Sequence, residues 1–565
     1  MKKTIGAAGA AFGMLSLGLS SPVAATSSAT SGHGPTADVS SSYTPPPVTW
    51  GACSNARLAK AGAECGFVQV PLDYAKPKGE KIKLAVSRIK HKTSDDKKQG
   101  IMLVNPGGPG GSGLTLSRLG GAVPNKGGDP YDWIGFDPRG VGSSVPTLAC
   151  DGNYFGYNRP DYRVTKAGTS KDWLKKTAAY SASCAKADGA KLMPHMKTID
   201  NVRDMDSIRK AFGEKQINFY GFSYGTYLGQ VYATMFPKQT RRMVMDGVVD
   251  PRDVWYDANL NQDVAFDKNM DVFFDWVAGN NSTYHLGTSG KAIKKQWYSM
   301  RDKLAKKPAN GKIGPDEWTD AYLNAGYYVF GWEDDGAALA AALKRGDFGP
   351  TTKLYDEANG SGPGSDNSYA VYLGTQCTDV KWPNSWSTWL SDNSKVDKKA
   401  PFETWANAMF NLPCTSWPVK ATNSQAIKID GSKVGPVLLI AETNDGATPF
   451  SGALEVRKRF PKSSLIEGVG GTTHSGSLNG IACTDDKISA YLLTGEMPKR
   501  TSGQGHADVG CDPVPQPAPG PANAVTESAS STAKKKHHHH HGEHRQGMQD
   551  DLRSSLQKVA TVGAR

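Results

Sequence analysis

The chain has 565 residues, which is enough for one large domain with an insertion or for two or three domains of ordinary size. Its formal net charge at pH 7 is +12, and 38% of its residues are hydrophobic. The sequence nowhere interleaves aromatic residues with Lys and Arg in the way of a nucleic-acid groove, so we expect no nucleic-acid partner. We attribute the excess positive charge to solubility and to a basic C-terminal tail.

The first 25 residues have the pattern of a secretory signal peptide. Lys2 and Lys3 precede an apolar run from Ile5 to Leu19, and Val23-Ala24-Ala25 supplies small residues before a cleavage site. The absence of an Arg-Arg pair favours the general secretion route. No later apolar run is long enough to span a bilayer. We therefore expect a secreted, extracellular protein without a membrane span.

Composition divides the chain into six segments. These are a signal peptide (1–25), a disordered leader or pro-segment (26–47), the first part of an α/β core (48–250), a helical cap (251–424), the second part of the core (425–512) and a low-complexity tail (513–565). The tail contains Lys534–Lys536 and His537–His541, a run that could chelate metal or be a purification tag, and we assign it no catalytic role. Weak affinity of this basic tail for an anionic cell wall stays open.

Short apolar runs predict the strands of a mostly parallel central sheet. Two antiparallel strands are expected at 68–72 and 82–86, and further strands at 100–104, 133–137, 217–220, 242–246, 437–442 and 464–467. Helices are expected at 204–212 and 224–236, and this alternation of strands with helices is typical of a parallel sheet. Residues 250–424 instead show helical spacing without a strand rhythm, so we expect a helical cap inserted between two strands.

Eight cysteines, an even number, agree with an oxidising destination. No C-x-x-C pair occurs, so a zinc site or a thioredoxin-like site has little support, and we expect no metal. Pairing of neighbours closes four local loops, and we predict the disulfides Cys53–Cys65, Cys150–Cys184, Cys377–Cys414 and Cys483–Cys511.

A G-x-S-x-G segment at residues 221–225 indicates a nucleophilic serine, Ser223. The pentapeptide alone is a weak signal in a chain so rich in Gly and Ser. Its context is stronger, because an apolar strand runs into it and a helix follows. A serine on such a turn projects its Oγ at the end of a sheet, where it can attack a substrate.

Two later strands supply a candidate acid and a candidate base in the order that such a serine requires. Asp445 follows the strand at 437–442, although Glu442 is an alternative acid nearer the strand body. His474 follows the last predicted strand, among glycines and before a helix. Four other histidines of the ordered region lack such a position: His91, His195, His285 and His506. We expect Asp445 to orient His474 and His474 to deprotonate Ser223.

Donors for an oxyanion are expected on both sides of the serine. The amide of Tyr224 follows the nucleophile directly, and a Gly-rich segment at 105–113 follows an earlier strand. That segment could also be a flexible linker or a phosphate cradle, but no Lys occupies the P-loop position. We choose Gly108 as the second donor, with Gly107 as the next choice.

Three segments resemble motifs of one enzyme family. Asn105–Gly110 is similar to the H-G-G-P-G segment of the proline iminopeptidase group of α/β-hydrolases, and Asp137–Ser144 is similar to its D-x-R-G-x-G-x-S turn. With Asp445–Pro449 (D-x-x-T-P) and the C-terminal cysteine pair, the chain most resembles the secreted tripeptidyl aminopeptidase branch found in Streptomyces and its relatives. The resemblance covers roughly residues 50–511. The usual Gly-His-Gly around the base is replaced by Thr473-His474-Ser475, which leaves the role of the base intact.

The resemblance implies an α/β-hydrolase fold and a serine exopeptidase that releases short peptides, tripeptides in this branch, from free N-termini through an acyl-enzyme. It also implies that an acidic group of the cap holds the free α-ammonium of a peptide or protein substrate. The candidates in this chain are Glu333, Asp334, Asp335 and Asp379. No metal or organic cofactor is implied, and we expect a monomer.

Two other hypotheses remain open. An exported esterase or lipase could use the same three residues, and a large aromatic cap would suit it equally well. A hydrolase-like shell could also persist as a binding protein, although an intact Ser, Asp and His in the right order argues against this.

Overall fold

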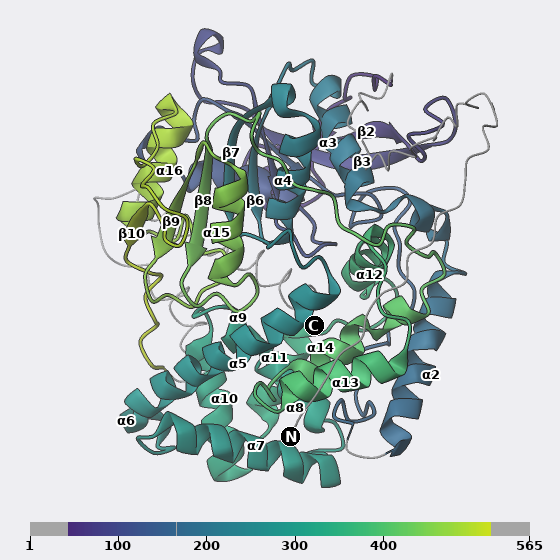
Figure 1. Ribbon diagram of the computed structural model, residues 1–565, viewed down its shortest axis with the longest axis vertical. Helices are drawn as coiled ribbons and strands as arrows, with labels where there is room; N and C mark the ends of the chain where they lie inside the picture. Colours follow the sequence, from purple (N-terminus) through teal and green to yellow (C-terminus); the bar gives the residue numbers. More distant parts are fainter. Residues whose placement is uncertain (1–42, 165–166, 521–565) are drawn as a thin grey trace, which may run out of the picture. The chain divides into compact units, whose positions relative to one another are not determined.

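A ten-stranded mixed sheet forms the centre of the computed structural model, which describes residues 43–164 and 167–520 (Figure 1). The strands are β1 (Gly51–Ala52), β2 (Glu64–Pro71), β3 (Lys81–Ile89), β4 (Ile101–Asn105), β5 (Asp132–Phe136), β6 (Ile217–Phe222), β7 (Thr240–Asp246), β8 (Val437–Glu442), β9 (Ser463–Gly468) and β10 (Val509–Cys511). The expected signal peptide, the leader before residue 43 and the tail after residue 520, with its histidine run, lie outside the described residues.

The strands lie in the order β1-β2-β3-β5-β4-β6-β7-β8-β9-β10. β1, β2, β3 and β5 pair antiparallel, and every pairing from β5 through β4 to β10 is parallel. In register, Leu103 of β4 lies opposite Phe219 of β6, which lies opposite Met243 of β7. The predicted strands are therefore confirmed, and the carboxyl ends of β4, β6, β7, β8 and β9 meet at one edge.

Ten helices follow β7 and precede β8, and no strand is present in this fully described stretch. They are α5 (Tyr256–Gly279), α6 (Asn281–Tyr284), α7 (Gly290–Lys306), α8 (Pro315–Ala321), α9 (Leu323–Tyr327), α10 (Trp332–Arg345), α11 (Gly349–Ala358), α12 (Asn367–Asp379), α13 (Trp386–Asp397) and α14 (Thr404–Asn411). We call α5–α14 the cap helices. Figure 1 shows most of them gathered beyond one end of β6, β7 and β8.

The remaining helices lie outside this stretch of the chain. They are α1 (Ala56–Lys60), α2 (Ala167–Cys184), α3 (Thr198–Ala211), α4 (Tyr224–Met235), α15 (Phe450–Arg459) and α16 (Ala482–Thr494). Short 3-10 helices occupy Asp95–Lys97, Leu114–Gly121, Pro124–Lys126, Ala190–His195, Pro237–Gln239 and Leu412–Thr415.

Both faces of the central strands are buried. Alternate residues of β6 enter different hydrophobic clusters: Phe219 belongs to a cluster that includes residues of α3, α4 and α15, whereas Tyr220 belongs to one that includes residues of α5 and α16. A strand covered on both faces needs a continuous apolar run, which is why the parallel strands were recognisable in the sequence.

Four disulfides join neighbouring cysteines, and no free cysteine remains among the described residues. They are Cys53–Cys65, Cys150–Cys184, Cys377–Cys414 and Cys483–Cys511. None of the helices in the described part of the chain is both long and apolar enough to cross a membrane.

Candidate active site

Ser223 occupies a sharp turn between β6 and α4. Its φ of 55° and ψ of −128° place a non-glycine residue in a strained conformation. The glycines on either side permit close packing, since a Cβ on Gly221 would lie 2.6 Å from the carbonyl oxygen of Gly225. A Cβ on Gly225 would lie 2.6 Å from the carbonyl oxygen of Asn105 in the Gly-rich loop. This turn has the geometry of a nucleophile elbow.

Asp445 and His474 form a buried hydrogen-bonded pair. Asp445 Oδ2 lies 2.8 Å from His474 Nδ1, and both side chains are almost fully buried. The backbone N–H groups of Ala447 and Thr448 each donate to Asp445 Oδ1 at 2.9 Å, and Thr448 Oγ1 donates to Oδ2 at 2.8 Å. These donors fix the carboxylate so that Oδ2 faces the imidazole, which orients the ring. The other ring nitrogen, Nε2, is buried and has no hydrogen bond within the described residues.

Asp246, the last residue of β7, connects the nucleophile turn with the loop that carries His474. Its carbonyl oxygen accepts hydrogen bonds from the Ser223 N–H at 2.9 Å and from Ser475 Oγ at 3.4 Å. Its carboxylate Oδ2 accepts the N–H of Ser477 at 2.8 Å. Burial raises the pKa of Asp246 to about 6. The two loops therefore share one anchor, although sequence reasoning did not single this residue out.

The cap helices also contact the His474 loop. The backbone carbonyl of Tyr327 in α9 accepts the backbone N–H of His474 at 2.7 Å. The rings of the two residues lie edge to face, with their centroids 5.7 Å apart. From α5, Asn269 Nδ2 donates to the carbonyls of Gly326 and Thr472 at 2.8 and 2.9 Å. The position of the imidazole thus depends on the cap. No motif marks Asn269 or Tyr327, because their importance arises only from tertiary contacts.

Glu442, the alternative acid, supports this loop without a hydrogen bond to the imidazole. Its carboxyl oxygens accept the N–H groups of Thr473 at 2.6 Å and Val514 at 2.9 Å. Burial, together with the nearby charges of Asp445 and Asp246, raises its pKa to about 8. Of the two acids, only Asp445 is hydrogen-bonded to His474 in the described structure.

The proton on Glu442 should make stability depend on pH. Its folded pKa of about 8 exceeds the usual value of 4.5, so between these pH values the folded state binds more protons than the unfolded chain. The stability that this proton contributes is complete below about pH 4.5 and is lost as the pH rises through about 8. In Glu442→Gln the side chain does not titrate. The unfolding free energy of the native protein minus that of the variant should therefore fall with rising pH, by at most about 1.4 kcal/mol per pH unit.

Urea denaturation at pH 5, 6.5 and 8 measures this difference, and Glu496→Gln, at an exposed position just after α16, is the matched control. A difference that stays constant across the three pH values would show that Glu442 does not titrate in this range.

The Gly-rich loop lies directly against the nucleophile turn. The N–H of Gly107 donates to Asn105 Oδ1 at 2.9 Å, so this donor is already occupied, whereas Gly108 lines the pocket beside Ser223 and Tyr224. Tyr224 is the first residue of α4, and its N–H therefore has no partner within the helix. These positions suit the two expected oxyanion donors, Tyr224 and Gly108.

The segment 137–144 explains why this loop keeps its shape. Asp137 Oδ1 accepts hydrogen bonds from Ser112 Oγ at 2.5 Å and from the Gly113 N–H at 3.1 Å. The neighbouring Arg139 is fully buried and pairs with Asp204 of α3 at 2.6 Å. The motif thus fixes the Gly-rich loop to the core.

Replacement of Gly107 by alanine should strongly lower activity. A Cβ there would lie 2.6 Å from the Phe222 carbonyl oxygen, 2.8 Å from the Tyr224 nitrogen and 2.9 Å from Ser223 Cβ, and the φ of 93° is unfavourable for alanine. The turn would have to move, and we expect kcat/KM to fall by about 100-fold or more because misplacement of about 1 Å has that effect. The matched control is Gly213→Ala, which has a similar positive φ but no atom within 4 Å of its Cβ. Equal kcat/KM losses in both variants would mean that only backbone strain matters.

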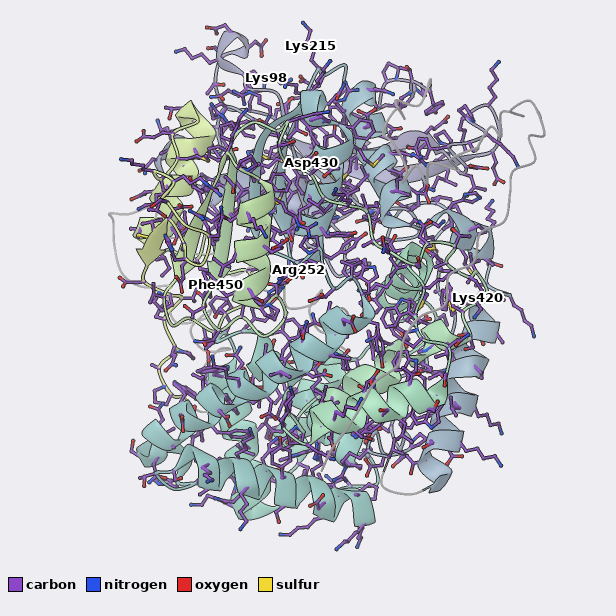
Figure 2. All side chains as sticks on the ribbon, viewed as in Figure 1. Lys98, Lys215, Arg252, Lys420, Asp430 and Phe450 are labelled. Atoms are coloured by element: carbon purple, nitrogen blue, oxygen red, sulfur yellow. A yellow bond between two sulfur atoms is a disulfide. The ribbon has the colours of Figure 1, made fainter. Side chains whose placement is uncertain are left out.

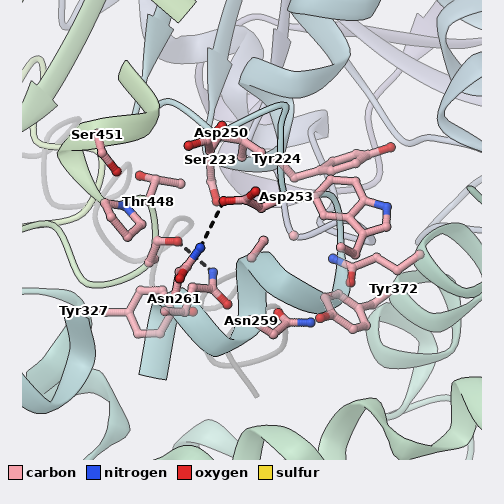
Figure 3. A pocket seen from close by; sticks show the side chains of 18 residues that line it. Ser223, Tyr224, Asp250, Asp253, Asn259, Asn261, Tyr327, Tyr372, Thr448 and Ser451 are labelled. Carbon is pink, nitrogen blue, oxygen red and sulfur yellow. Dashed lines mark hydrogen bonds between the residues drawn. The ribbon is translucent and has the colours of Figure 1, made fainter. Parts of the chain in front are cut away.

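A pocket opens beside Ser223, between the strand ends and the cap helices (Figure 3). Its walls come from the nucleophile turn, from the loops after β7 and β8, and from α5, α9 and α12. The lining residues are Gly108, Ser223, Tyr224, Val249, Asp250, Asp253, Trp255, Ala258, Asn259, Asn261, Gln262, Tyr327, Tyr372, Gln376, Ala447, Thr448, Pro449 and Ser451. Within the described ranges, no group of three or more His, Cys, Asp or Glu side chains could hold a metal ion.

The acids expected to bind a substrate ammonium do not line this cavity. Glu333, Asp334 and Asp335 lie in the first turn of α10, where carboxylates interact favourably with the helix dipole. Asp379 accepts hydrogen bonds from the Thr198 N–H and Oγ1, both at 2.6 Å, and from Trp255 Nε1 at 3.1 Å. The carboxylates that do line the cavity are Asp250 and Asp253 of the loop after β7, which sequence reasoning missed.

The mostly parallel sheet, the serine at a strand–helix turn, and an acid and a histidine after later strands define an α/β-hydrolase. A family model described as TAP-like protein matches residues 400–504. The chain is 40% identical to the tripeptidyl aminopeptidase of Streptomyces lividans over 84% of its own length and 88% of the relative. The chain therefore belongs to the tripeptidyl aminopeptidase family and is a serine peptidase.

More distant relatives carry other names. Serine protease Hip1 of Mycobacterium tuberculosis is 28% identical over 80% of this chain and 90% of that protein. Carboxylesterase B of the same organism is also 28% identical, over 77% of this chain and 85% of its own length.

Proposed function

We propose that this protein is a secreted serine exopeptidase that removes tripeptides from free N-termini of peptides or proteins. The observation that carries the proposal is the cavity beside Ser223, whose wall contains the carboxylates of Asp250 and Asp253. A wall with negative charge suits a substrate that ends in an α-ammonium group. Four disulfides and the signal-peptide pattern of the first 25 residues support export.

In this mechanism Ser223 Oγ attacks the carbonyl carbon of the scissile peptide bond, and its proton passes to His474 Nε2. Asp445 holds the proton on Nδ1 and stabilises the imidazolium. The N–H groups of Tyr224 and Gly108 stabilise the oxyanion. His474 then protonates the leaving amine, and a water molecule activated by the same imidazole hydrolyses the acyl-enzyme.

Asp253 is our choice for the group that binds the α-ammonium. Asp250 is paired with Arg252 at 2.5 Å, near the boundary between the sheet and the cap helices (Figures 2 and 3). Asp253 accepts a hydrogen bond from Asn261 Nδ2 at 3.0 Å, but within the described residues it has no ion pair. Partial burial and the neighbouring charge of Asp250 raise its pKa. A substrate cation would relieve both effects, which favours binding of a free amine.

A substrate panel with Asp253→Asn tests this function. Native enzyme should cleave Ala-Ala-Ala-p-nitroanilide about 100-fold faster, in kcat/KM, than its N-acetyl derivative. Asp253→Asn removes one charged hydrogen-bonding partner of the α-ammonium. It should lower kcat/KM for the free-amine substrate by about tenfold or more and leave kcat/KM for the N-acetyl substrate unchanged. Asp347→Asn, on an exposed loop of the cap, is the matched control.

Equal rates on the free and acetylated substrates would contradict an exopeptidase. Fast hydrolysis of short acyl esters with no cleavage of free-amine peptides would favour the esterase hypothesis, to which the similarity with Carboxylesterase B gives some support.

A further inference from the structure

A chain of buried polar side chains connects the cap interior with the cavity. Asn407 Nδ2 of α14 donates to Asp263 Oδ1 of α5 at 2.8 Å, and Asn411 Nδ2 donates to Asn407 Oδ1 at 2.8 Å. The hydroxyl of Tyr372 in α12 then donates to Asn411 Oδ1 at 2.8 Å. All four residues are buried, and every bond points in the same direction. The chain therefore fixes the hydroxyl proton of Tyr372, which lines the cavity.

This direction also fixes the amide of Gln376, one turn later on α12. Because the Tyr372 proton is committed to Asn411, the Tyr372 oxygen is left as an acceptor, and the side-chain amide of Gln376 lies close enough to interact with it. The Gln376 carbonyl oxygen, Oε1, must then point elsewhere. It is buried, and among the described residues it has no hydrogen-bond partner. Gln376 is only 5% exposed and lines the cavity.

Asn259 of α5 lies on the same wall, near Tyr372 (Figure 3). Its Nδ2 is also near the Tyr372 oxygen, but it makes no hydrogen bond of normal geometry with any described residue. The wall thus presents one buried acceptor, Gln376 Oε1, and one buried donor, Asn259 Nδ2. A buried polar atom without a partner costs about 1–3 kcal/mol, so a ligand that satisfies both atoms is favoured.

We propose that Gln376 and Asn259 form a subsite for a main-chain peptide group of the substrate's acyl portion. Gln376 Oε1 accepts the peptide N–H, and Asn259 Nδ2 donates to the peptide carbonyl. The inference rests on the proposed function and deepens it, because it names what the cavity recognises between Ser223 and Asp253. Recognition of the main chain would select acyl groups with an internal peptide bond while tolerating different side chains.

The test compares Gln376→Met with the native enzyme on four substrates. These are Ala-Ala-Ala-p-nitroanilide, two analogues in which lactate replaces the second or the third residue, and p-nitrophenyl acetate. Lactate replaces a peptide N–H by an ester oxygen, and acetate has no peptide group. For the tripeptide we expect Gln376→Met to lower kcat/KM by about 10- to 100-fold, and for the acetate to change it less than about twofold.

One of the two lactate substrates should already be poor for the native enzyme and should lose little more in Gln376→Met, because the variant and the substrate remove the same hydrogen bond. Asn259→Ala should likewise slow the tripeptide and spare the acetate. Gln296→Met is the matched control, since that side chain lies on α7, donates to the Leu286 carbonyl and is outside the cavity lining, and the change should leave all rates unchanged.

Equal losses of kcat/KM on the tripeptide and the acetate in Gln376→Met would overturn the inference. It would also be overturned if both lactate substrates lost as much kcat/KM in the variant as the tripeptide does. If native enzyme cleaves the acetate but not the tripeptide, the proposed function itself fails. Native cleavage of the tripeptide with either of the first two results contradicts the subsite alone.

Discussion

Replacement of Ser223 by alanine is expected to lower kcat/KM for free-amine tripeptide anilides by about 10⁵-fold while the fold is retained. Without Oγ there is no nucleophile for the acyl-enzyme, and the remaining groups stabilise only the attack of water. Alanine keeps the Cβ of serine, so the strained φ of 55° at this turn costs the variant no more than the native protein. The melting temperature should therefore change by less than a few degrees.

Active-site titration and steady-state kinetics on the same preparation measure this loss. Ser432→Ala, at an exposed position before β8, is the control for replacement of a serine in general. Retention of more than about 1% of native kcat/KM in Ser223→Ala would remove Ser223 from its assigned role, since contaminating activity and water attack account for far less.

The sheet and the nucleophile turn could be predicted because their signals are local. A strand buried on both faces requires a continuous apolar run, and the elbow requires glycines at fixed positions around Ser223. The order of Asp445 and His474 followed from the same pattern, since each lies just after such a strand. The three-residue strand β10 was missed, because pairing with β9 rather than its own composition creates it.

The walls of the cavity could not be predicted in this way. Asp253 stands in a loop beside Pro251 and Arg252, and nothing in that composition distinguishes it from a solvated turn. The acids of α10 form a cluster in the sequence and were therefore candidates for binding the substrate. In the structure they lie in the first turn of the helix, where their carboxylates interact favourably with the helix dipole. Contacts between residues far apart in the chain, such as the hydrogen bond between Tyr372 and Asn411, become visible only in the folded cap.

Replacement of Asp445 by asparagine is expected to lower kcat/KM by about 10⁴-fold without loss of the fold. The N–H groups of Ala447 and Thr448 both donate to Oδ1, so the amide oxygen of the variant should take that place. The amide NH₂ would then face His474 Nδ1 and donate to it. The imidazole would adopt the opposite tautomer, with its proton on Nε2, and could no longer accept the proton of Ser223.

Glu442→Gln separates this effect from a general disturbance of the buried acids. Glu442 binds the N–H of Thr473, next to His474, but not the imidazole, so its replacement should lower kcat/KM by about tenfold through a small displacement of the loop. Steady-state rates of both variants over a range of tripeptide anilide concentrations give kcat/KM for the comparison, with folding checked by near-ultraviolet circular dichroism. If Glu442→Gln loses as much activity as Asp445→Asn, the tautomer argument fails, because a residue without a bond to the imidazole would then matter equally.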